Sequence, residues 1–190
     1  MGKSTACDML RRMGLPVHDA DAAVHRLLGP GGAAVAPVGR AFPGVVRGGA
    51  VDRAKLGARV FGRPDDLRRL ERIVHPMVRD AARAFLRRCA RARRPLAVLD
   101  IPLLFESGGE ALCDLVVTLS APPFVQTARV LARRNMTPAR LRAILSTQMS
   151  DREKRRRADV IVETGLSKRA TLRQLRRAVR LASRGRRQEH

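Results

Sequence analysis

Three short apolar runs, separated by helical segments, limit the folds open to this chain more than any other feature. Residues 96–101 (LAVLDI) are apolar apart from one acid near the end, and residues 115–119 and 160–162 repeat that character. Continuous apolar strands are typical of a parallel sheet buried on both faces, and helices supply the crossovers that join parallel strands. The sequence therefore predicts an α/β fold, with a parallel sheet flanked by helices.

Helical spacing accounts for most of the remaining chain. Between residues 52 and 94 apolar side chains recur at steps of three and four residues, and Pro64 and Pro76 are expected to divide this stretch into at least three helices. A helix after Lys3 is expected to end at Gly14 as its C′ residue. The glycine- and proline-rich residues 29–50 predict only a short helix or turn.

A partial phosphate-binding motif stands at the N-terminus. Gly2-Lys3-Ser4 matches the end of the pattern G-x-x-x-x-G-K-[ST], in which backbone N–H groups cradle phosphates, the lysine reaches the β and γ oxygens and the hydroxyl binds Mg²⁺. Met1 fills the fourth variable position, so the pattern's first glycine and the strand before it are absent from the sequence. The helical segment that follows favours a mononucleotide site over an unstructured tail.

Acidic residues follow two of the expected strands. Asp19 and Asp21 come just after the short apolar stretch 15–18, and Asp100 lies near the end of the run 96–101. Ligands of open α/β sheets bind at the carboxyl ends of the strands. One acid of the first pair is a candidate general base for a hydroxyl nucleophile, with a helix cap as the alternative. Asp100 is a candidate Mg²⁺ ligand acting through water.

A cationic stretch follows the second apolar run. Arg129 and Arg133 share one helix face, because they are four residues apart. Other arginines continue the stretch: Arg134, Arg140, Arg152 and Arg155 to Arg157. Solvated surface is the ordinary role of each one, but as a group they suit a lid that closes over a transferring phosphate. His75, just before Pro76, is either a structural residue or a donor to substrate.

The net charge of +22 points first to a polyanionic partner. Only four of the 39 basic residues are lysine, a bias typical of GC-rich coding, so much of this charge is expected to be solvated surface. The chain has no Trp or Tyr and only five Phe, and it therefore lacks the aromatic platforms on which single-stranded nucleic acid stacks. A basic nucleic-acid-binding protein remains a minor alternative.

Other features favour a cytoplasmic protein. The sequence has no apolar run near the roughly 18 residues of a membrane span and no apolar signal-peptide region. Its three cysteines, Cys7, Cys89 and Cys113, are an odd number without a metal-binding spacing. We expect reduced thiols and no membrane association.

Taken in order, the motifs resemble the dephospho-CoA kinase family. The segments that carry the resemblance, over nearly the whole chain, are residues 1–5 (MGKST), 17–21 (VHDAD), 70–76 (LERIVHP), 100–106 (DIPLLFE), 126–129 (QTAR), Arg133, Gln148 and 158–161 (ADVI). The resemblance implies a P-loop kinase that transfers the γ-phosphoryl group of ATP to the ribose 3′-hydroxyl of dephospho-CoA, the last step of coenzyme A synthesis, with ATP and Mg²⁺ as cofactors.

The resemblance also implies roles for individual residues. Asp21, Lys3 and Arg133 would be catalytic, and Ser4 and Asp100 would hold the metal. The expected ATP and phosphate ligands are Gly2, Lys3, Ser4, Thr5, Arg133, Arg140 and Arg152. The expected dephospho-CoA contacts are Asp21, Arg53, His75, Pro102, Leu103, Leu104 and Phe105.

The same resemblance implies one kinase domain over residues 1–190 in three parts. The core would comprise residues 1–51, 96–133 and 158–182, the helical CoA-binding part residues 52–95, and the lid residues 134–157. We expect a monomer whose partners are ATP and dephospho-CoA, with no specific nucleic acid. The alternatives are another nucleoside or nucleotide kinase, which would not need His75-Pro76, and an inactive form, because the sequence begins inside the motif.

Overall fold

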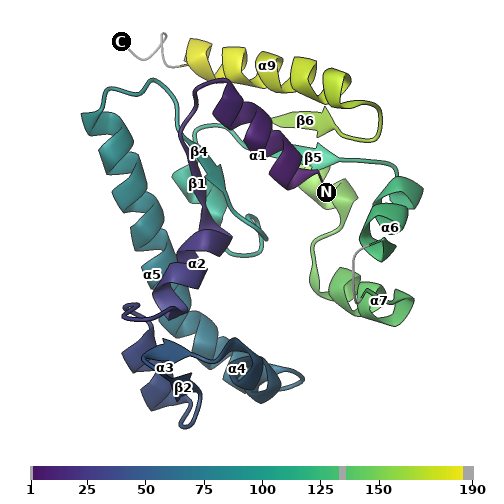
Figure 1. The fold of residues 1–190 in the computed structure, drawn as a ribbon. Coiled ribbons are helices and arrows are strands. Elements are labelled where there is room, and N and C mark those ends of the chain that lie inside the picture. Colours follow the sequence, from purple (N-terminus) through teal and green to yellow (C-terminus); the bar gives the residue numbers. More distant parts are fainter. Residues whose placement is uncertain (1, 133–135, 186–190) are drawn as a thin grey trace. The chain divides into compact units, whose positions relative to one another are not determined.

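The computed structural model describes residues 2–132 and 136–185, and they form two compact units (Figure 1). The first unit contains residues 1–17 and 94–190, and the second contains residues 18–93. Among the described residues, no helix is both long enough and apolar enough to cross a membrane. The predicted division into core, CoA-binding part and lid stays a prediction.

A parallel strand pair forms the centre of the first unit. Strand β5 (Val117–Ser120) pairs in parallel with β6 (Val160–Glu163), so that Ser120 lies opposite Glu163 at the carboxyl end. Helices α1 (Lys3–Arg12) and α9 (Lys168–Gly185) pack with this pair through a buried cluster of Ala6, Val162 and Leu175. Parallel strands packed with helices confirm the predicted fold class.

Helix α1 ends where the sequence predicts. Gly14 follows the helix with φ +81°, a left-handed conformation that costs glycine little because it has no Cβ atom. Its N–H donates to the carbonyl oxygen of Arg11 at 2.9 Å. After the turn the chain reaches Pro16, whose carbonyl accepts the N–H of Val98, the first residue of β4 (Val98–Asp100). The turn therefore brings the chain back beside the strand that ends in Asp100.

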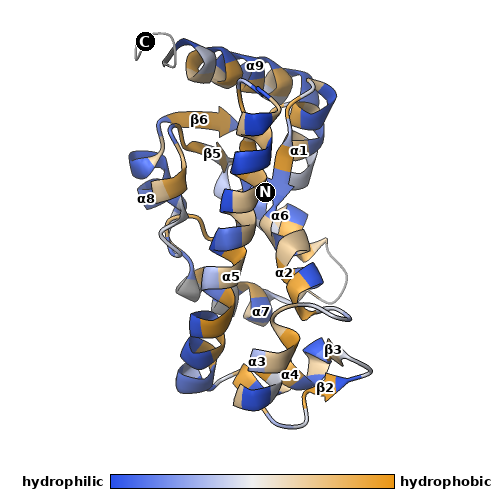
Figure 2. Cartoon of the chain, turned by 90° about the vertical axis from the view of Figure 1, so that its left-hand side faces the viewer, coloured by the Kyte–Doolittle hydropathy of each residue, from blue (hydrophilic) through white to orange (hydrophobic). Residues whose placement is uncertain are grey.

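The other regular elements of the first unit are helices and one 3₁₀ turn, among the described residues. They are the 3₁₀ turn η1 (Gly109–Leu112), α6 (Pro123–Leu131), α7 (Pro138–Thr147) and α8 (Asp151–Arg157). Thr137 caps α7 by accepting the N–H of Arg140, and Ser150 caps α8 by accepting the N–H of Glu153. Helix α9 carries hydrophobic residues interleaved with hydrophilic ones (Figure 2), which lets one side pack while the other stays in water.

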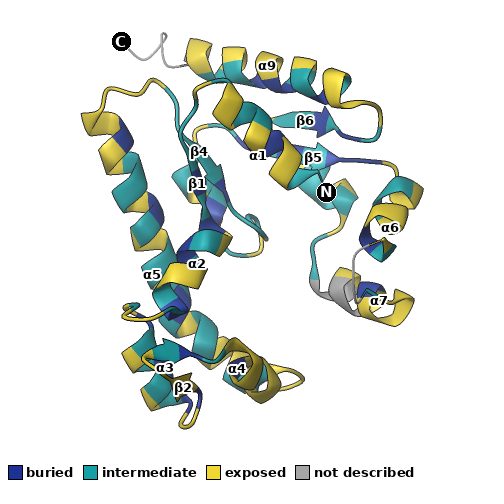
Figure 3. Cartoon of the chain, viewed as in Figure 1, coloured by how far each residue is buried: buried dark blue, intermediate teal, exposed yellow. Residues whose placement is uncertain are grey.

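The second unit begins at residue 18, within strand β1 (Val17–Asp19), and is mostly helical, with buried and exposed positions interleaved along its helices (Figure 3). It contains α2 (Ala20–Leu28), α3 (Val35–Ala41), α4 (Arg53–Val60) and α5 (Pro64–Arg91). Their core includes the fully buried Val38 and Phe42.

A hairpin in residues 29–50 was not predicted. Strands β2 (Val46–Arg47) and β3 (Ala50–Val51) pair in antiparallel fashion around Gly48 and Gly49, which have φ +56° and +74°. Two successive residues with positive φ form the turn that suits a two-residue hairpin, and the Gly-Gly pair was the signal for it.

The prediction that Pro76 divides the helix was wrong. Helix α5 continues through Pro76 from Pro64 to Arg91, although proline lacks the N–H that the helix would use there. Apolar residues on both sides of the proline, Ile73, Val74, Met77 and Val78, belong to the same hydrophobic core. Burial of both halves offsets the local cost of the proline.

Candidate phosphate-binding site

The N-terminus of α1 has the geometry of an anion site. Gly2 is the N-cap residue, with φ +82° and ψ +5°, and its carbonyl accepts the N–H of Ala6 at 2.9 Å. The first N–H groups of a helix have no acceptor within the helix, and the helix dipole places partial positive charge beside them. No acidic residue lies in this first turn, and Ser4 and Thr5 are exposed. The predicted phosphate ligands Gly2 to Thr5 thus lie together at one helix end.

Thr164 lies against Gly2 and limits what that position accepts. A Cβ atom at Gly2 would stand 3.4 Å from the Cβ of Thr164, and the positive φ of Gly2 already favours glycine. Thr164 is itself buried, and both its N–H and its hydroxyl donate to the carbonyl of Ser120, at 2.7 and 3.0 Å. The end of the strand pair therefore supports the start of α1.

Lys3 forms an ion pair with Asp100. The Lys3 Nζ atom lies 2.9 Å from Asp100 Oδ1, and the side chains are 38% and 9% exposed. Asp100 is the last residue of β4, so a buried carboxylate at a strand end holds a partly exposed ammonium group. The structure therefore brings together the predicted phosphate lysine and the predicted metal acid. The described residues include no group of three or more His, Cys, Asp or Glu side chains placed to bind a metal by themselves.

Cys7 is a further neighbour of this pair. Burial raises its pKa to about 12, and the negative charge of Asp100 and a hydrogen bond to it act in the same direction. The thiol is therefore protonated at neutral pH and donates to Asp100. The sequence predicts only a reduced thiol at Cys7, and nothing in its spacing marks it as a neighbour of Asp100.

The second unit holds Asp21, Arg53 and His75. Asp19 is the helix cap of the acidic pair, because its carboxylate accepts the N–H of Ala22 at 2.9 Å. Asp21 is exposed in the first turn of α2. Arg53 donates to Nδ1 of His25 at 2.6 Å, and His75 is partly buried within α5.

The loop after β4 contains the other predicted dephospho-CoA contacts. Leu103 has φ +53°, a conformation uncommon for residues other than glycine, and its side chain is exposed. Its neighbours Pro102, Leu104 and Phe105 are partly buried. The N–H of Ser107 donates to the carbonyl of Leu103 at 2.9 Å, which closes the turn. The loop thus presents one leucine to solvent from an ordered turn.

The predicted lid arginines have different positions. Arg140 lies in the first turn of α7, and Arg152 is exposed on α8. Arg133 lies outside the residues that the structure describes. Arg129 donates to the carbonyl of Thr164 at 2.9 Å, so it supports the strand end rather than standing free on a helix face.

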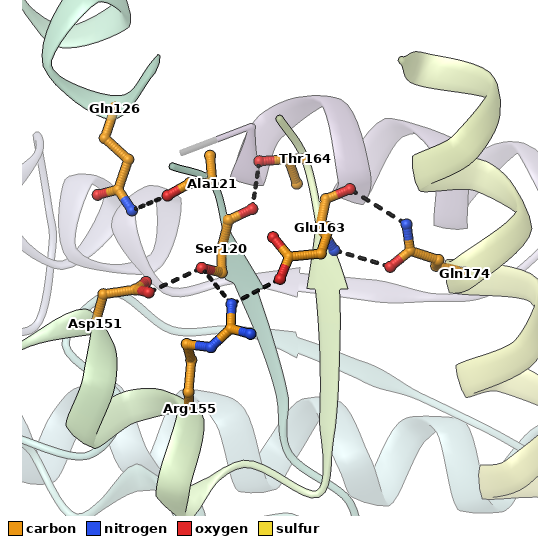
Figure 4. A network of polar contacts seen from close by, with 8 residues as sticks. All are labelled: Ser120, Ala121, Gln126, Asp151, Arg155, Glu163, Thr164 and Gln174. Carbon is orange, nitrogen blue, oxygen red and sulfur yellow. Dashed lines mark hydrogen bonds and ion pairs between the residues drawn. The ribbon is translucent and has the colours of Figure 1, made fainter. Parts of the chain in front are cut away.

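Polar contacts anchor α8 to the strand pair (Figure 4). The Ser120 hydroxyl donates to Asp151 at 2.8 Å, and Arg155 donates to Ser120 and to Glu163 at 3.0 and 2.7 Å. The side-chain amide of Gln174 on α9 accepts the backbone N–H of Glu163 and donates to the carbonyl oxygen of the same residue. Arg155 was grouped with the lid arginines from the sequence; its partners Ser120 and Glu163 lie outside α8, and no local pattern in this basic helix marks them.

Comparison with known proteins settles the family. The family model described as "Dephospho-CoA kinase" matches residues 1–168. A dephospho-CoA kinase from Paramagnetospirillum magneticum is 65% identical over 155 residues, which cover 82% of this chain and 73% of that protein. The chain belongs to the dephospho-CoA kinase family. A second dephospho-CoA kinase, from Rhodospirillum rubrum, is 54% identical and extends the match to 97% of this chain and 88% of the relative.

Solved structures agree with this family assignment. A crystal structure from Thermus thermophilus has a TM-score of 0.80 at 36% identity, covering 94% of this chain and 90% of that one. A dephospho-CoA kinase from Campylobacter jejuni has a TM-score of 0.72 at 22% identity, which supports the fold. The resemblance to dephospho-CoA kinases and the P-loop kinase fold predicted from the sequence are therefore confirmed.

Proposed function

We propose that this protein transfers the γ-phosphoryl group of ATP to the ribose 3′-hydroxyl of dephospho-CoA, giving coenzyme A and ADP. The observation that carries the proposal is the Lys3–Asp100 pair at the N-terminus of α1, in a chain of the dephospho-CoA kinase family. The transition state spreads negative charge over the phosphoryl oxygens, so catalysis depends mainly on positive groups held in fixed positions around them.

The start of α1 binds the phosphates of ATP in this proposal. Its N–H groups donate to phosphate oxygens, and Gly2 lets the backbone approach them closely. Lys3 exchanges part of its contact with Asp100 for a phosphate oxygen, and its 38% exposure leaves the ammonium group accessible. Ser4 and Thr5 supply hydroxyl groups at the same helix end.

Mg²⁺ fits the residues present. The ion prefers oxygen ligands and is commonly held by one or two carboxylates together with substrate phosphates. Asp100 offers a buried carboxylate beside Lys3, and Ser4 offers a hydroxyl at the phosphate end of α1. When bound, the ion would neutralise charge on the phosphates. We assign Ser4 and Asp100 as the residues that hold it.

The acceptor side rests on residue roles that family membership supports. Asp21, which is exposed in the first turn of α2, accepts the proton of the 3′-hydroxyl. Arg53, His75 and the loop residues Pro102, Leu103, Leu104 and Phe105 contact dephospho-CoA. The exposed Leu103 suits the apolar part of such a ligand.

Arginines complete the proposed site. Arg133 is assigned to the transferring phosphate, and Arg140 and Arg152 to the lid, because guanidinium groups bind phosphate oxygens in pairs. We also propose that the enzyme acts in the cytoplasm as a monomer, with ATP and dephospho-CoA as its partners.

The test is an acceptor panel with the purified protein. With ATP and Mg²⁺ present, dephospho-CoA, adenosine, AMP and cytidine are compared, and the products are identified by mass spectrometry. The proposal expects phosphorylation of dephospho-CoA on the ribose 3′-hydroxyl and little transfer to the others. Preferred transfer to a nucleoside or nucleotide would support the alternative kinase, and no transfer to any acceptor would support an inactive form.

A further inference from the structure

The carboxylate of Glu106 joins two distant parts of the first unit. Its Oε1 atom accepts the N–H of Met149 at 2.9 Å and lies 3.1 Å from Nζ of Lys154. Residue 106 as a whole is exposed, but its side chain is only 19% exposed because the carboxylate is directed at these partners. The proposed function gives this residue no role.

The environment of Glu106 favours its charged form. Burial by itself would raise its pKa, but the N–H groups of Glu106 and Met149 and the ammonium group of Lys154 outweigh burial and lower the pKa. Glu106 is therefore ionised at neutral pH. A charged carboxylate with two fixed donors is a stronger link than an exposed ion pair.

One end of this link is the loop that follows β4. The loop begins directly after Asp100, the partner of Lys3, and includes Leu103 and its neighbours, which are assigned to dephospho-CoA. Internal hydrogen bonds give it a fixed shape, since Gly109 donates to the carbonyl of Leu104 at 2.8 Å. Movement at Glu106 is therefore transmitted along an ordered turn.

The other end is the junction between α7 and α8. Met149 lies between the two helices, and Lys154 lies within α8. Helix α8 is anchored to the strands by Asp151 and Arg155, whereas α7 carries Arg140, a residue assigned to the lid. The contact at Met149 therefore acts just beyond the C-terminal end of α7, where the chain enters the anchored helix α8.

We propose that Glu106 is a positioning residue, which ties the acceptor loop to the α7–α8 junction and so holds the lid arginines in register with the bound substrate. This inference rests on the proposed function. Loss of the link misplaces groups that act in the transition state, and small misplacements of such groups cost turnover more than binding.

The experiment compares three changes at the link with a matched control. Glu106→Ala removes both contacts, while Glu106→Gln and Lys154→Met each remove the ion pair and keep an acceptor for Met149. The control is Glu153→Gln, which breaks an exposed ion pair of the same helix, that between Glu153 and Arg157 at 2.9 Å. Thermal unfolding of each variant accounts for any loss of folded protein.

We expect Glu106→Ala to lower kcat at least about tenfold, with the KM values for both substrates changed less than about threefold. Glu106→Gln and Lys154→Met should have smaller effects on kcat that are not additive in the double variant, because both remove the same contact. Glu153→Gln should match the wild type. An unchanged kcat in Glu106→Ala, or a loss seen only in KM, would overturn the proposal.

Hydrogen exchange supplies a readout that does not depend on turnover. In Glu106→Ala the amides around Met149 should exchange at least about tenfold faster than in the wild type, and in Glu153→Gln they should not. Unchanged exchange would overturn the link itself. If the wild type does not phosphorylate dephospho-CoA, the proposed function fails, and the exchange experiment still decides whether Glu106 holds the junction.

Discussion

At the scale of single residues, the pairing of Lys3 with Asp100 shows how the phosphate site is kept ready. A lysine at a helix N-terminus meets the positive end of the helix dipole, which by itself disfavours the ammonium group. The nearly buried Asp100 carboxylate, 2.9 Å away, compensates for this and fixes where the ammonium group stands. The charge that a phosphate needs is therefore present before the phosphate binds.

Asp21 is the residue on which the proposed proton transfer depends. Asp21→Asn keeps the size of the side chain and removes its ability to accept a proton. We expect kcat to fall at least about a hundredfold while ATP affinity stays nearly unchanged, as for loss of a general base. Steady-state rates and calorimetry with ATP measure the two quantities. Equal losses in turnover and ATP affinity would assign Asp21 to phosphate binding or folding instead.

Cys7 provides a pH test of its own environment, in which burial and the neighbouring Asp100 raise the pKa of the thiol. Its pKa of about 12 in the folded protein exceeds the ordinary value of 9.0, so the folded state retains the proton more strongly than the unfolded state. The resulting stability is fully present below pH 9 and is lost as the pH rises from 9 towards 12. Urea unfolding should therefore show a steeper loss of stability above pH 9 in the wild type than in Cys7→Ser. Parallel slopes would mean that the folded protein does not raise the pKa of the Cys7 thiol.

At the scale of elements, the apolar runs and Gly14 predicted the structure correctly, whereas Pro76 did not. The three apolar runs became β4, β5 and β6, and Gly14 ended α1 as expected, because these features depend on local burial and backbone conformation. Pro76 was misjudged because the contacts that keep α5 continuous through it come from the tertiary core, which no local rule contains.

The same limit applies to the site. The residues of the phosphate motif were predictable because they are adjacent in sequence and share one helix end. The contact of Asp100 with Cys7 spans 93 positions of the sequence, and that of Glu106 with Lys154 spans 48. In a chain with so many basic residues, charge alone does not show which acid pairs with which base.

Pro76 offers a test of the balance within α5. Pro76→Ala restores a backbone N–H and removes a ring from the helix interior, where proline costs about 3 kcal/mol relative to alanine. Part of this gain is offset, because the variant's unfolded chain is more flexible. We expect urea unfolding to show a net stabilisation of about 2 kcal/mol, which is the proline cost less this offset. A destabilised variant would show that the proline ring makes packing contacts worth more than the restored hydrogen bond.

At the scale of the whole molecule, the charge of +22 has a limited role in this account. Several arginines form exposed ion pairs with acidic residues three or four positions away on the same helix. Examples are Arg68, Arg83 and Arg157. Exposed pairs of this kind contribute little to stability, so they are consistent with a solvated basic surface.

Binding to labelled single-stranded RNA tests the role of that surface. We expect binding that is weak, without sequence preference, and lost between about 50 and 200 mM salt, because it comes from counterion release alone. Fluorescence anisotropy at several salt concentrations measures it. Tight binding to one sequence at 200 mM salt would contradict this expectation and favour a nucleic-acid-binding protein.

Transfer of the labelled γ-phosphoryl group of ATP to dephospho-CoA, measured in the wild type and in Lys3→Met, tests the central claim most directly. Circular dichroism first establishes that the variant is folded. The wild type should form 3′-phosphorylated product, and Lys3→Met should be slower by at least about a hundredfold, because the lysine stabilises charge on the transferring group. Equal rates in the two proteins, or no transfer to dephospho-CoA by the wild type, would contradict the account.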